Sequence, residues 1–416
     1  MIKAIKVKNF KTFKELDVEL GNFNVLIGAN ASGKSNFISI FRFLKDIVST
    51  GLGNAISMHG GVEYLRNINI GASKNLSIKV VFDREFRAAQ LFKGDLIGMR
   101  TYEIIYEFAL KFNKRGSGFT IVRDELVLKY KVVRLEKKRK KIEEKDIFGN
   151  GEIIISRGGN GKINIDINMP DEIPLKEGDI FPSYLREERL SRGELLLERP
   201  FFLIPFPIKL YLEDIAIYDF DPKLSRRAYP ITGKAELEEN GENLSIVIKN
   251  ILQSKEKRRK FFNLVKELLP FVENLDVEKF ADKSLLFKLQ ETYSKNQYLP
   301  ASLLSDGTIN VTALIIALYF EGKPLIIIEE PERNIHPSLI SRIVEMMKDA
   351  SSREERIIVT THNPEIVKYA GLENILFISR DDNGFSKVSR PADREEIKAF
   401  LKNDIGIEEL YVQNLF

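Results

Sequence analysis

A glycine-rich segment near the amino end carries the residues best suited to chemistry. The segment 28–35, Gly-Ala-Asn-Ala-Ser-Gly-Lys-Ser, follows an apolar run at 23–27 and precedes helical apolar spacing at 36–44. In such a loop, backbone N–H groups surround a β-phosphate, Lys34 reaches β- and γ-phosphate oxygens, and the Ser35 hydroxyl is placed to ligate Mg²⁺. The segment therefore predicts a nucleoside-phosphate site. The alternative is a glycine-bearing turn without a ligand, and both flanks argue against it.

Two adjacent carboxylates end a second apolar run. Leu-Ile-Ile-Ile at 325–328 precedes Glu329 and Glu330, a pattern typical of a buried parallel strand. Glu329 stands where a direct or water-mediated Mg²⁺ contact is usual, and Glu330 where a general base polarises an attacking water. The alternative is a strand that ends in solvated acids.

Two further segments carry groups that suit a γ-phosphate. Ser305-Asp306-Gly307-Thr308 precedes the apolar helix expected at 309–319, where backbone N–H groups and the helix dipole attract anions. The same four residues are also a common cap and turn. His362 follows the apolar strand expected at 357–359, and at the carboxyl edge of a parallel sheet a histidine can reach the phosphate site. A lone histidine is otherwise usually structural.

Other elements follow from apolar periodicity. Ile2–Phe10 alternates apolar and basic residues, and we expect a strand beside the strand at 23–27. Further strands are predicted in a mostly antiparallel sheet, at 76–82, 102–110, 120–128 and 151–155. The glycines between 51 and 61 predict a flexible loop, and helical spacing between 243 and 275 predicts two helices. Residues 170–235 show poor periodicity and receive no assignment.

Bulk composition narrows the class of protein. With 416 residues, 44% of them hydrophobic and 30% charged, the chain predicts one large or two moderate globular domains. Because no apolar run approaches the roughly 18 residues of a membrane span, we expect a cytoplasmic protein without membrane contact. The absence of cysteine excludes disulfides and thiolate zinc sites, and a formal charge of +4 argues neither for nor against nucleic acid.

The order of these motifs resembles ATPases of the ABC superfamily, in the RecF/SMC-like branch that includes "AAA-type core" ATPases and the ATPase part of OLD-family proteins. The matching text is 7–13, 28–36, 304–308, 328–332 with 335–337, and 360–365. The resemblance implies an α/β P-loop NTPase with a mixed parallel core sheet, an antiparallel β subdomain and a helical insertion lobe. The implied domains are an N-terminal ATPase lobe (1–165), an insertion and helical lobe (166–290) and a C-terminal ATPase lobe (291–416).

The resemblance also implies roles for single residues. Lys34 and Ser35 would hold phosphates and Mg²⁺, Glu329 would be the Walker B metal acid, Glu330 the catalytic base and His362 the switch histidine. Further nucleotide contacts are implied for Lys11, Gly28, Asn30, Ala31, Ser32, Gly33 and Asn36, and for Ser305, Asp306 and Gly307 of the signature motif. Residues 333–336 resemble the D-loop at the dimer interface.

Four departures from the family pattern bear on this transfer. Ala31 stands where glycine is frequent, which is harmless unless its φ is positive. Asp306 adds a negative charge near a phosphate, and Glu329 replaces the aspartate of transporters. No Q-loop glutamine is found, since Gln90 is the one glutamine before 253 and does not fit the role.

The implied activity is slow, partner-stimulated ATP hydrolysis by a homodimer that buries two ATP molecules in a two-fold interface. One implied setting is DNA repair, maintenance or defence, with the basic segment 134–145 as a candidate phosphate contact. That segment is alternatively a solvated sheet edge. The other setting is an ATP-gated subunit that licenses a separate effector such as a nuclease. A transporter subunit and a P-loop kinase fit the motifs less well.

Overall fold

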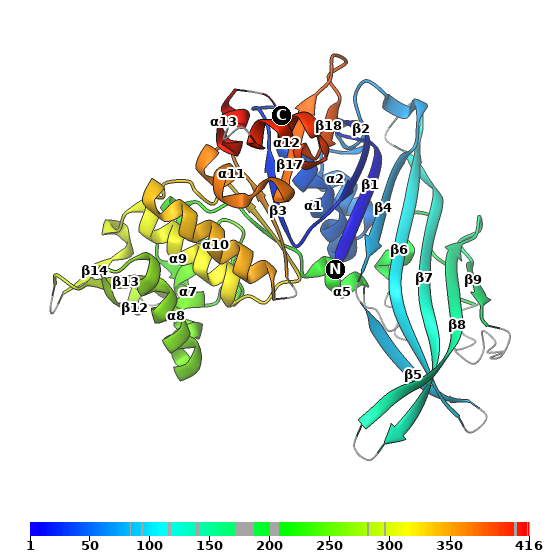
Figure 1. The fold of residues 1–416 in the computed structure, drawn as a ribbon, viewed down its shortest axis with the longest axis horizontal. Helices are drawn as coiled ribbons and strands as arrows, with labels where there is room; N and C mark the ends of the chain where they lie inside the picture. Colours follow the sequence, from blue (N-terminus) through cyan, green and yellow to red (C-terminus); the bar gives the residue numbers. More distant parts are fainter. Residues whose placement is uncertain are drawn as a thin grey trace. The chain divides into compact units, whose positions relative to one another are not determined.

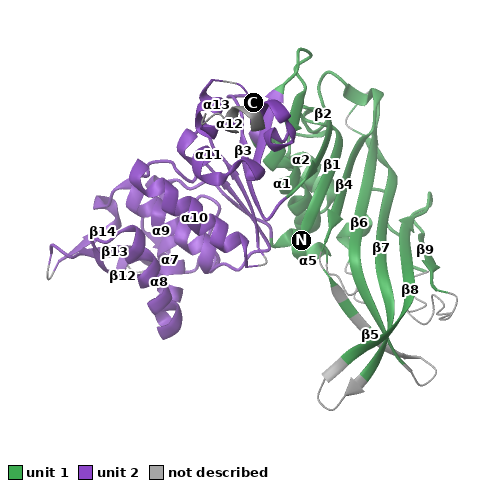
Figure 2. Ribbon diagram, viewed as in Figure 1, with its two compact units in different colours: residues 1–20, 35–214, 380–388 green, residues 21–34, 215–379, 389–416 purple. Residues whose placement is uncertain are grey.

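The computed structural model describes the chain except residues 84, 93–94, 115, 117, 139–140, 171–186, 200–207, 281–282, 295–296, 354, 403–405, 414 and 416. It divides into two compact units (Figure 2). Unit 1 contains 1–20, 35–214 and 380–388, and unit 2 contains 21–34, 215–379 and 389–416. The sequence-based domain limits at 165 and 290 stay predictions.

Unit 1 contains an antiparallel sheet of eight described strands (Figure 1). Their order is β2-β1-β4-β6-β7-β8-β9, and β5 pairs with β6. The strands are β1 (Ile2–Phe10), β2 (Phe13–Glu19), β4 (Leu76–Phe82), β5 (Phe86–Phe92), β6 (Asp95–Phe112), β7 (Phe119–Lys138), β8 (Lys141–Arg157) and β9 (Ile163–Asn168). The predicted antiparallel sheet is thereby confirmed.

The expected position of the first strand is wrong. β1 pairs with β2 and β4, whereas β3 (Phe23–Ile27) pairs with β16 (Arg356–Thr360) and β17 (Ile375–Arg380). The burial pattern explains the difference, because β1 alternates buried residues with exposed lysines while all five residues of β3 are buried. A strand with one polar face suits an antiparallel sheet, and a strand buried throughout suits a covered parallel sheet.

The helices of unit 1 follow the P-loop. They are α1 (Lys34–Thr50), α2 (Leu52–Met58), α3 (Val62–Leu65) and α5 (Ile208–Glu213), with 3-10 turns η1 (Gly71–Ser73) and η3 (Leu196–Glu198). The first residue of α1, Lys34, belongs to unit 2. The loop expected between 51 and 61 is wrong. Gly51 and Gly61, with φ of 89° and 84°, directly precede α2 and α3, so these glycines separate short helices.

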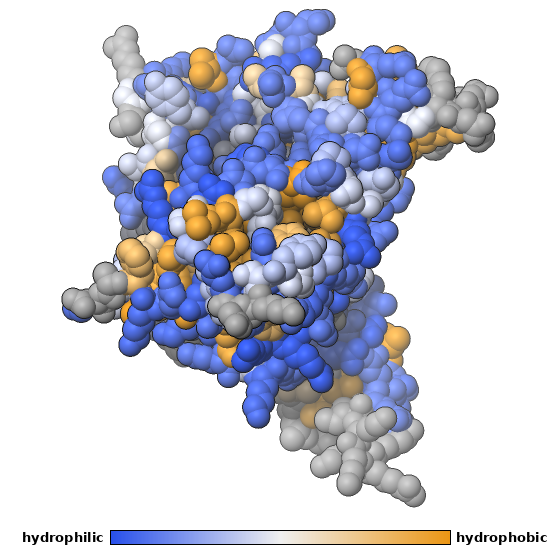
Figure 3. All heavy atoms as spheres, turned by 90° about the vertical axis from the view of Figure 1, so that its left-hand side faces the viewer, coloured by the Kyte–Doolittle hydropathy of each residue, from blue (hydrophilic) through white to orange (hydrophobic). Residues whose placement is uncertain are grey.

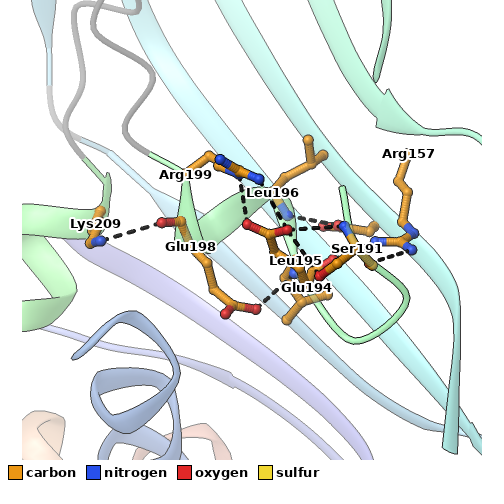
Figure 4. A network of polar contacts seen from close by, with 9 residues as sticks. Arg157, Ser191, Glu194, Leu195, Leu196, Glu198, Arg199 and Lys209 are labelled. Carbon is orange, nitrogen blue, oxygen red and sulfur yellow. Dashed lines mark hydrogen bonds and ion pairs between the residues drawn. The ribbon is translucent and has the colours of Figure 1, made fainter. Parts of the chain in front are cut away.

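Polar contacts place part of the segment that the sequence left unassigned. Asp124 on β7 accepts hydrogen bonds from the Tyr106 hydroxyl and the Leu196 N–H, both at 2.8 Å. Arg157 on β8 donates to the carbonyls of Ser191 and Glu194 (Figure 4). Burial raises the pKa of Asp124 to about 6. Since buried polar groups hold this segment, apolar periodicity could not reveal it.

Unit 2 contains a parallel sheet in the order β10-β15-β16-β3-β17, with β10 (Ala216–Tyr218) and β15 (Leu325–Glu329). The predicted parallel strands at 325–329 and 357–360 are confirmed. A second, antiparallel sheet contains β11 (Tyr229–Pro230), β12 (Val272–Phe280), β13 (Ser284–Glu291) and β14 (Tyr298–Pro300). The last strand, β18 (Ser386–Ser389), has its first three residues in unit 1.

Within unit 2, one apolar cluster joins the parallel sheet to α7 (Leu244–Gln253), α8 (Lys255–Leu268), α9 (Asp306–Tyr319), α10 (Ile340–Ser351) and α11 (Pro364–Ala370). The unit also contains α6 (Pro222–Ser225), α12 (Glu395–Lys402) and α13 (Ile407–Val412), with 3-10 turns η4 (Ala301–Leu303), η5 (Pro337–Leu339), η6 (Leu372–Asn374) and η7 (Pro391–Asp393). Every residue of α9 from Thr308 to Leu318 is buried, which is the pattern of a core helix. The two helices predicted between 243 and 275 are α7 and α8.

One face of the molecule is mostly polar (Figure 3). On the face drawn in Figure 3, hydrophilic side chains predominate and apolar side chains gather near the middle. Among the described residues, every helix is too short or too polar to span a lipid bilayer.

Candidate functional site

The P-loop joins β3 to α1, and its first glycine is fixed by a close approach of backbone. A Cβ atom on Gly28 would lie 2.1 Å from the Ile378 carbonyl oxygen, so a larger residue displaces the strand beside it. The loop turns through a hydrogen bond from the Ser32 N–H to the Ala29 carbonyl at 3.2 Å. Ala29, Asn30 and Ala31 are exposed. The loop therefore presents its backbone to solvent from a rigid strand end.

Lys34 folds back over this loop. Its Nζ atom donates to the carbonyls of Gly28 at 2.8 Å and Ala29 at 3.1 Å. Burial lowers the pKa of Lys34, and the charge of Glu330 opposes that shift. The ammonium group is thus held by neutral dipoles at the position where the motif predicts a phosphate.

Ala31 adopts a conformation that favours glycine. Its φ is 61°, in the left-handed region that costs a residue with Cβ roughly 1–2 kcal/mol. From the sequence, we expect Ala31 to be harmless unless its φ is positive. Because the φ is positive, Ala31 strains the loop.

The two carboxylates at the end of β15 differ in backbone geometry. Glu329 is the last strand residue and lies opposite Thr360 of β16. Glu330 leaves the strand with a φ of 47°, and its N–H donates to the Thr360 carbonyl at 2.9 Å. Glu329 is thus held within the paired strand, whereas Glu330 lies in the turn that follows it.

An arginine of the D-loop segment binds the predicted base. Arg333 donates to Glu330 Oε2 from Nη2 at 3.1 Å and to Asp219 Oδ1 from Nη1 at 2.8 Å. Asp219 directly follows β10, which pairs in parallel with β15. One guanidinium thereby joins the carboxyl ends of neighbouring strands.

His362 lies within electrostatic reach of the P-loop. Its pKa is lowered by burial first and by the Lys34 charge second, and Glu330 acts in the opposite direction. The neutral imidazole is therefore favoured at neutral pH.

Glu332 holds the segment on which His362 lies. The Thr361 hydroxyl donates to the Glu332 carboxylate and accepts from the Asn363 N–H at 2.9 Å. Burial raises the pKa of Glu332, while bonds from Thr361 and from backbone N–H groups lower it. Glu332, directly before the D-loop segment, is thus bound to the residue that precedes His362.

The signature residues form the start of α9. Ser305 is its N-cap, and its Oγ accepts from the Thr308 N–H at 3.2 Å. A Cβ atom on Gly307 would lie 2.6 Å from the Asn334 carbonyl oxygen, and Asn310 donates to the Arg333 carbonyl at 2.7 Å. Gly307 is therefore needed for close packing of α9 on the D-loop segment.

Asp306 has a partner that the sequence reasoning missed. Arg226, directly after α6, forms an ion pair with Asp306 at 2.7 Å and donates to the Leu304 carbonyl. The extra negative charge expected at the signature is thereby balanced within unit 2.

The remaining predicted residues belong to unit 1. Ser35 is exposed on α1, and its carbonyl accepts from the Ser39 hydroxyl at 2.8 Å. Lys11 Nζ donates to Ser39 Oγ at 3.2 Å, and burial lowers the pKa of Lys11. Asn36 donates to Thr12 Oγ1 at 3.0 Å. The Lys11 side chain thus contacts α1 at Ser39, one helical turn beyond Ser35.

The structure brings Lys34, Glu330 and His362 together, while the contacts of Ser305, Asp306 and Gly307 are with α9, Arg226 and the D-loop segment. Sequence reasoning missed Asp219, Arg226 and the role of Glu332. Asp219 had one usable signal, because it ends a short apolar run at 215–218. Hydroxyl and carboxylate oxygens are the kinds of ligand that Mg²⁺ prefers, so the Ser35 side chain of unit 1 and the Glu329 side chain of unit 2 are each of a suitable type.

Comparisons with known proteins bear on the family and the fold of the chain. A family model described as "AAA domain, putative AbiEii toxin, Type IV TA system" matches residues 23–368. A 42-residue segment is 45% identical to endonuclease GajA of Bacillus cereus (strain VD045), and this match spans 10% of the chain and 7% of that protein.

Solved structures of SMC heads have similar folds. The Smc head domain of Pyrococcus furiosus, bound to the C-terminal domain of ScpA, has a TM-score of 0.50 at 15% identity, covering 96% of this chain and 99% of that chain. The SMC head domain of Thermotoga maritima has a TM-score of 0.42 at 13% identity, covering 94% and 98%. The first of these shows the predicted α/β P-loop fold of the SMC-head type. Because the family model extends over most of the sequence, the chain belongs to this AAA-domain family.

Proposed function

We propose that this protein binds ATP with Mg²⁺, hydrolyses it, and forms a head-to-tail homodimer on ATP. The observation that carries the proposal is the position of Lys34, whose ammonium group is held at the P-loop by two carbonyls with Glu330 and His362 in electrostatic reach. Phosphoryl transfer to water uses a cation at the phosphates and a group that positions the attacking water, and a neutral imidazole can add a hydrogen bond at the γ-phosphate.

Each residue then has a defined task. Lys34 exchanges its carbonyl partners for β- and γ-phosphate oxygens. Ser35 and Glu329 would hold Mg²⁺, which supplies charge neutralisation at the phosphates. Glu330 orients the attacking water and accepts its proton, which requires that Arg333 release or share this carboxylate. His362 in its neutral form donates or accepts one hydrogen bond at the γ-phosphate.

The position of the signature supports the proposed dimer. Ser305 and Gly307 are fixed to α9 and the D-loop segment, and the family resemblance assigns them to the ATP bound by a second copy. In a two-fold arrangement, each signature meets the partner's P-loop, so two nucleotides are enclosed in one isologous interface. Hydrolysis then separates the copies.

The variant Glu330→Gln tests this proposal. Without the carboxylate, water is not activated, so ATP hydrolysis falls by at least about a hundredfold while the ATP-bound dimer accumulates. Size-exclusion chromatography with light scattering, at saturating ATP and Mg²⁺, measures the dimer. The matched control is K34A/E330Q, which stays monomeric. An E330Q variant that is monomeric with ATP contradicts the dimer.

The biological setting has two candidates. One is DNA repair, maintenance or defence, and the other is an ATP-gated subunit that licenses an effector nuclease. The 42-residue match to endonuclease GajA supports a link to a nuclease. ATPase assays with and without DNA, and pulldown of a co-expressed nuclease with and without ATP, separate the two. Stimulation by DNA of the isolated protein favours the first, and ATP-dependent capture of the nuclease without such stimulation favours the second.

A further inference from the structure

The first turns of α8 carry an unusual concentration of positive charge. Five of the six residues from Lys255 to Lys260 are lysine or arginine, with Glu256 as the exception. All six are exposed, although the same helix buries Phe261 and Val265 further along. Figure 1 shows α8 reaching the lower edge of unit 2. This end of the helix therefore extends from its unit without burying a side chain.

The charges of this helix end are not balanced locally. We call Lys255, Lys257, Arg258 and Arg259 the α8 cationic end. Within the part of the chain that the structure describes, none of the four has a carboxylate at ion-pair distance, and Arg258 lies over the Phe262 ring at 5.7 Å. Lys266, on the same helix, pairs with Glu273 at 3.3 Å.

The basic hairpin that the sequence singled out is different. Arg134 on β7 pairs with Asp146 at 3.7 Å, and Lys145 on β8 pairs with Glu136 at 3.6 Å. Residues 139–140 lie outside the described residues. Arg134 and Lys145 thus face carboxylates of the neighbouring strand, whereas the α8 cationic end faces solvent.

The helix itself disfavours this charge pattern. The amino end of a helix carries the positive end of its dipole, so cations are less favourable there than at the carboxyl end. Lys255 also lies three and four residues before Arg258 and Arg259, the spacings at which like charges repel across a helix turn. A bound polyanion relieves both repulsions.

Three features identify the kind of polyanion. Phe261, Val265 and Leu268 of α8 are buried. Phe262 and Leu264 are half-buried against the same apolar cluster, so the helix offers little apolar surface to a lipid. Residues 255–260 contain no aromatic ring on which an unpaired base stacks. Successive side chains are turned by about 100° around the axis, so the cations point to several sides, which suits a helix end between the two phosphate strands of a groove.

We propose that the α8 cationic end binds the phosphate backbone of double-stranded DNA without reading its sequence. The choice of DNA rests on the DNA-associated setting proposed above, whereas the ATP site does not enter the argument. Contacts of this kind give affinity through counterion release and depend steeply on salt.

The test uses the full chain and a labelled duplex of random sequence in fluorescence anisotropy titrations between 50 and 200 mM salt. The variant K255Q/K257Q/R258Q/R259Q removes the four cations, and K6Q/K8Q/K145Q/K266Q removes four ion-paired lysines with the same change in net charge. We expect the α8 variant to lose at least about tenfold in affinity, with a salt slope shallower by about 3. The control variant changes affinity by less than about threefold.

A charge-conserving variant, K255R/K257R/R258K/R259K, should retain affinity because phosphate contacts need charge rather than a given side chain. Equal losses in the two glutamine variants overturn the proposal, as does an absence of DNA binding by the unmodified protein. Stronger binding to single-stranded DNA, to anionic vesicles or to poly-glutamate than to the duplex also overturns it. ATP hydrolysis without DNA is measured in parallel, and its absence contradicts the ATPase proposal alone.

Discussion

The P-loop and the signature segment of unit 2 are both polar turns at the start of a helix, yet they treat charge in opposite ways. Lys34 has its ammonium group on neutral carbonyls, so its charge is available to an anion. Asp306 has its carboxylate against Arg226, so its charge is cancelled before any phosphate approaches. The P-loop therefore has a charge that can attract a phosphate, whereas the signature segment has a paired carboxylate that does not repel one.

The largest expected effect comes from removing the ammonium group of Lys34 in the P-loop. Lys34→Ala should weaken ATP binding by at least about a hundredfold, since two charge-assisted hydrogen bonds of about 1.5–3 kcal/mol each are lost. Titration with a fluorescent ATP analogue measures the change. Lys223→Ala, at an exposed lysine of the same unit, is the matched control. Unchanged affinity in the Lys34 variant contradicts the P-loop assignment.

The signature side is tested by a double-mutant cycle. Arg226→Gln leaves the Asp306 charge unopposed, so ATP-dependent dimerisation in the E330Q background should weaken by about tenfold, equivalent to about 1.4 kcal/mol. Adding Asp306→Asn removes that charge and should restore most of the dimer. Sedimentation velocity at several protein concentrations measures the dimerisation constant.

The outcome of this cycle separates electrostatics from structure. If D306N does not rescue R226Q, then Arg226 acts by holding the Leu304 carbonyl, and charge cancellation is not its role. Binding of ATP to the protein's own P-loop should be the same in all four variants of the cycle.

The smallest expected effect concerns the strain in the P-loop. Ala31→Gly relieves the positive φ, at a cost in unfolded-state entropy, so the free energy of unfolding should rise by about 0.5 kcal/mol. Ala29→Gly is the matched control, because Ala29 is a neighbouring exposed loop residue without positive φ, and it should be neutral or destabilising. Denaturant unfolding measures both. A loss of stability in A31G equal to that in A29G contradicts the strain.

Much of the candidate site could be predicted because its parts are local. The P-loop and the strand before Glu329 each combine a motif with a buried strand that the sequence pattern shows directly. The position of β1 could not be predicted, because alternation specifies a half-buried strand but not its neighbours. Arg226 was missed because its short helix has four residues and no apolar period.

The sequence by itself determined the chemistry that is available: a lysine and a serine after glycines, two carboxylates after an apolar strand, and a histidine after another. These are short-range patterns, in which each residue type is required by its immediate neighbours. Only the tertiary structure decided which charges meet, placing Arg333 between Glu330 and Asp219, Arg226 against Asp306, and no carboxylate among the described residues against the α8 cationic end. Pairing of this kind depends on distances between segments far apart in the chain, which local periodicity does not contain.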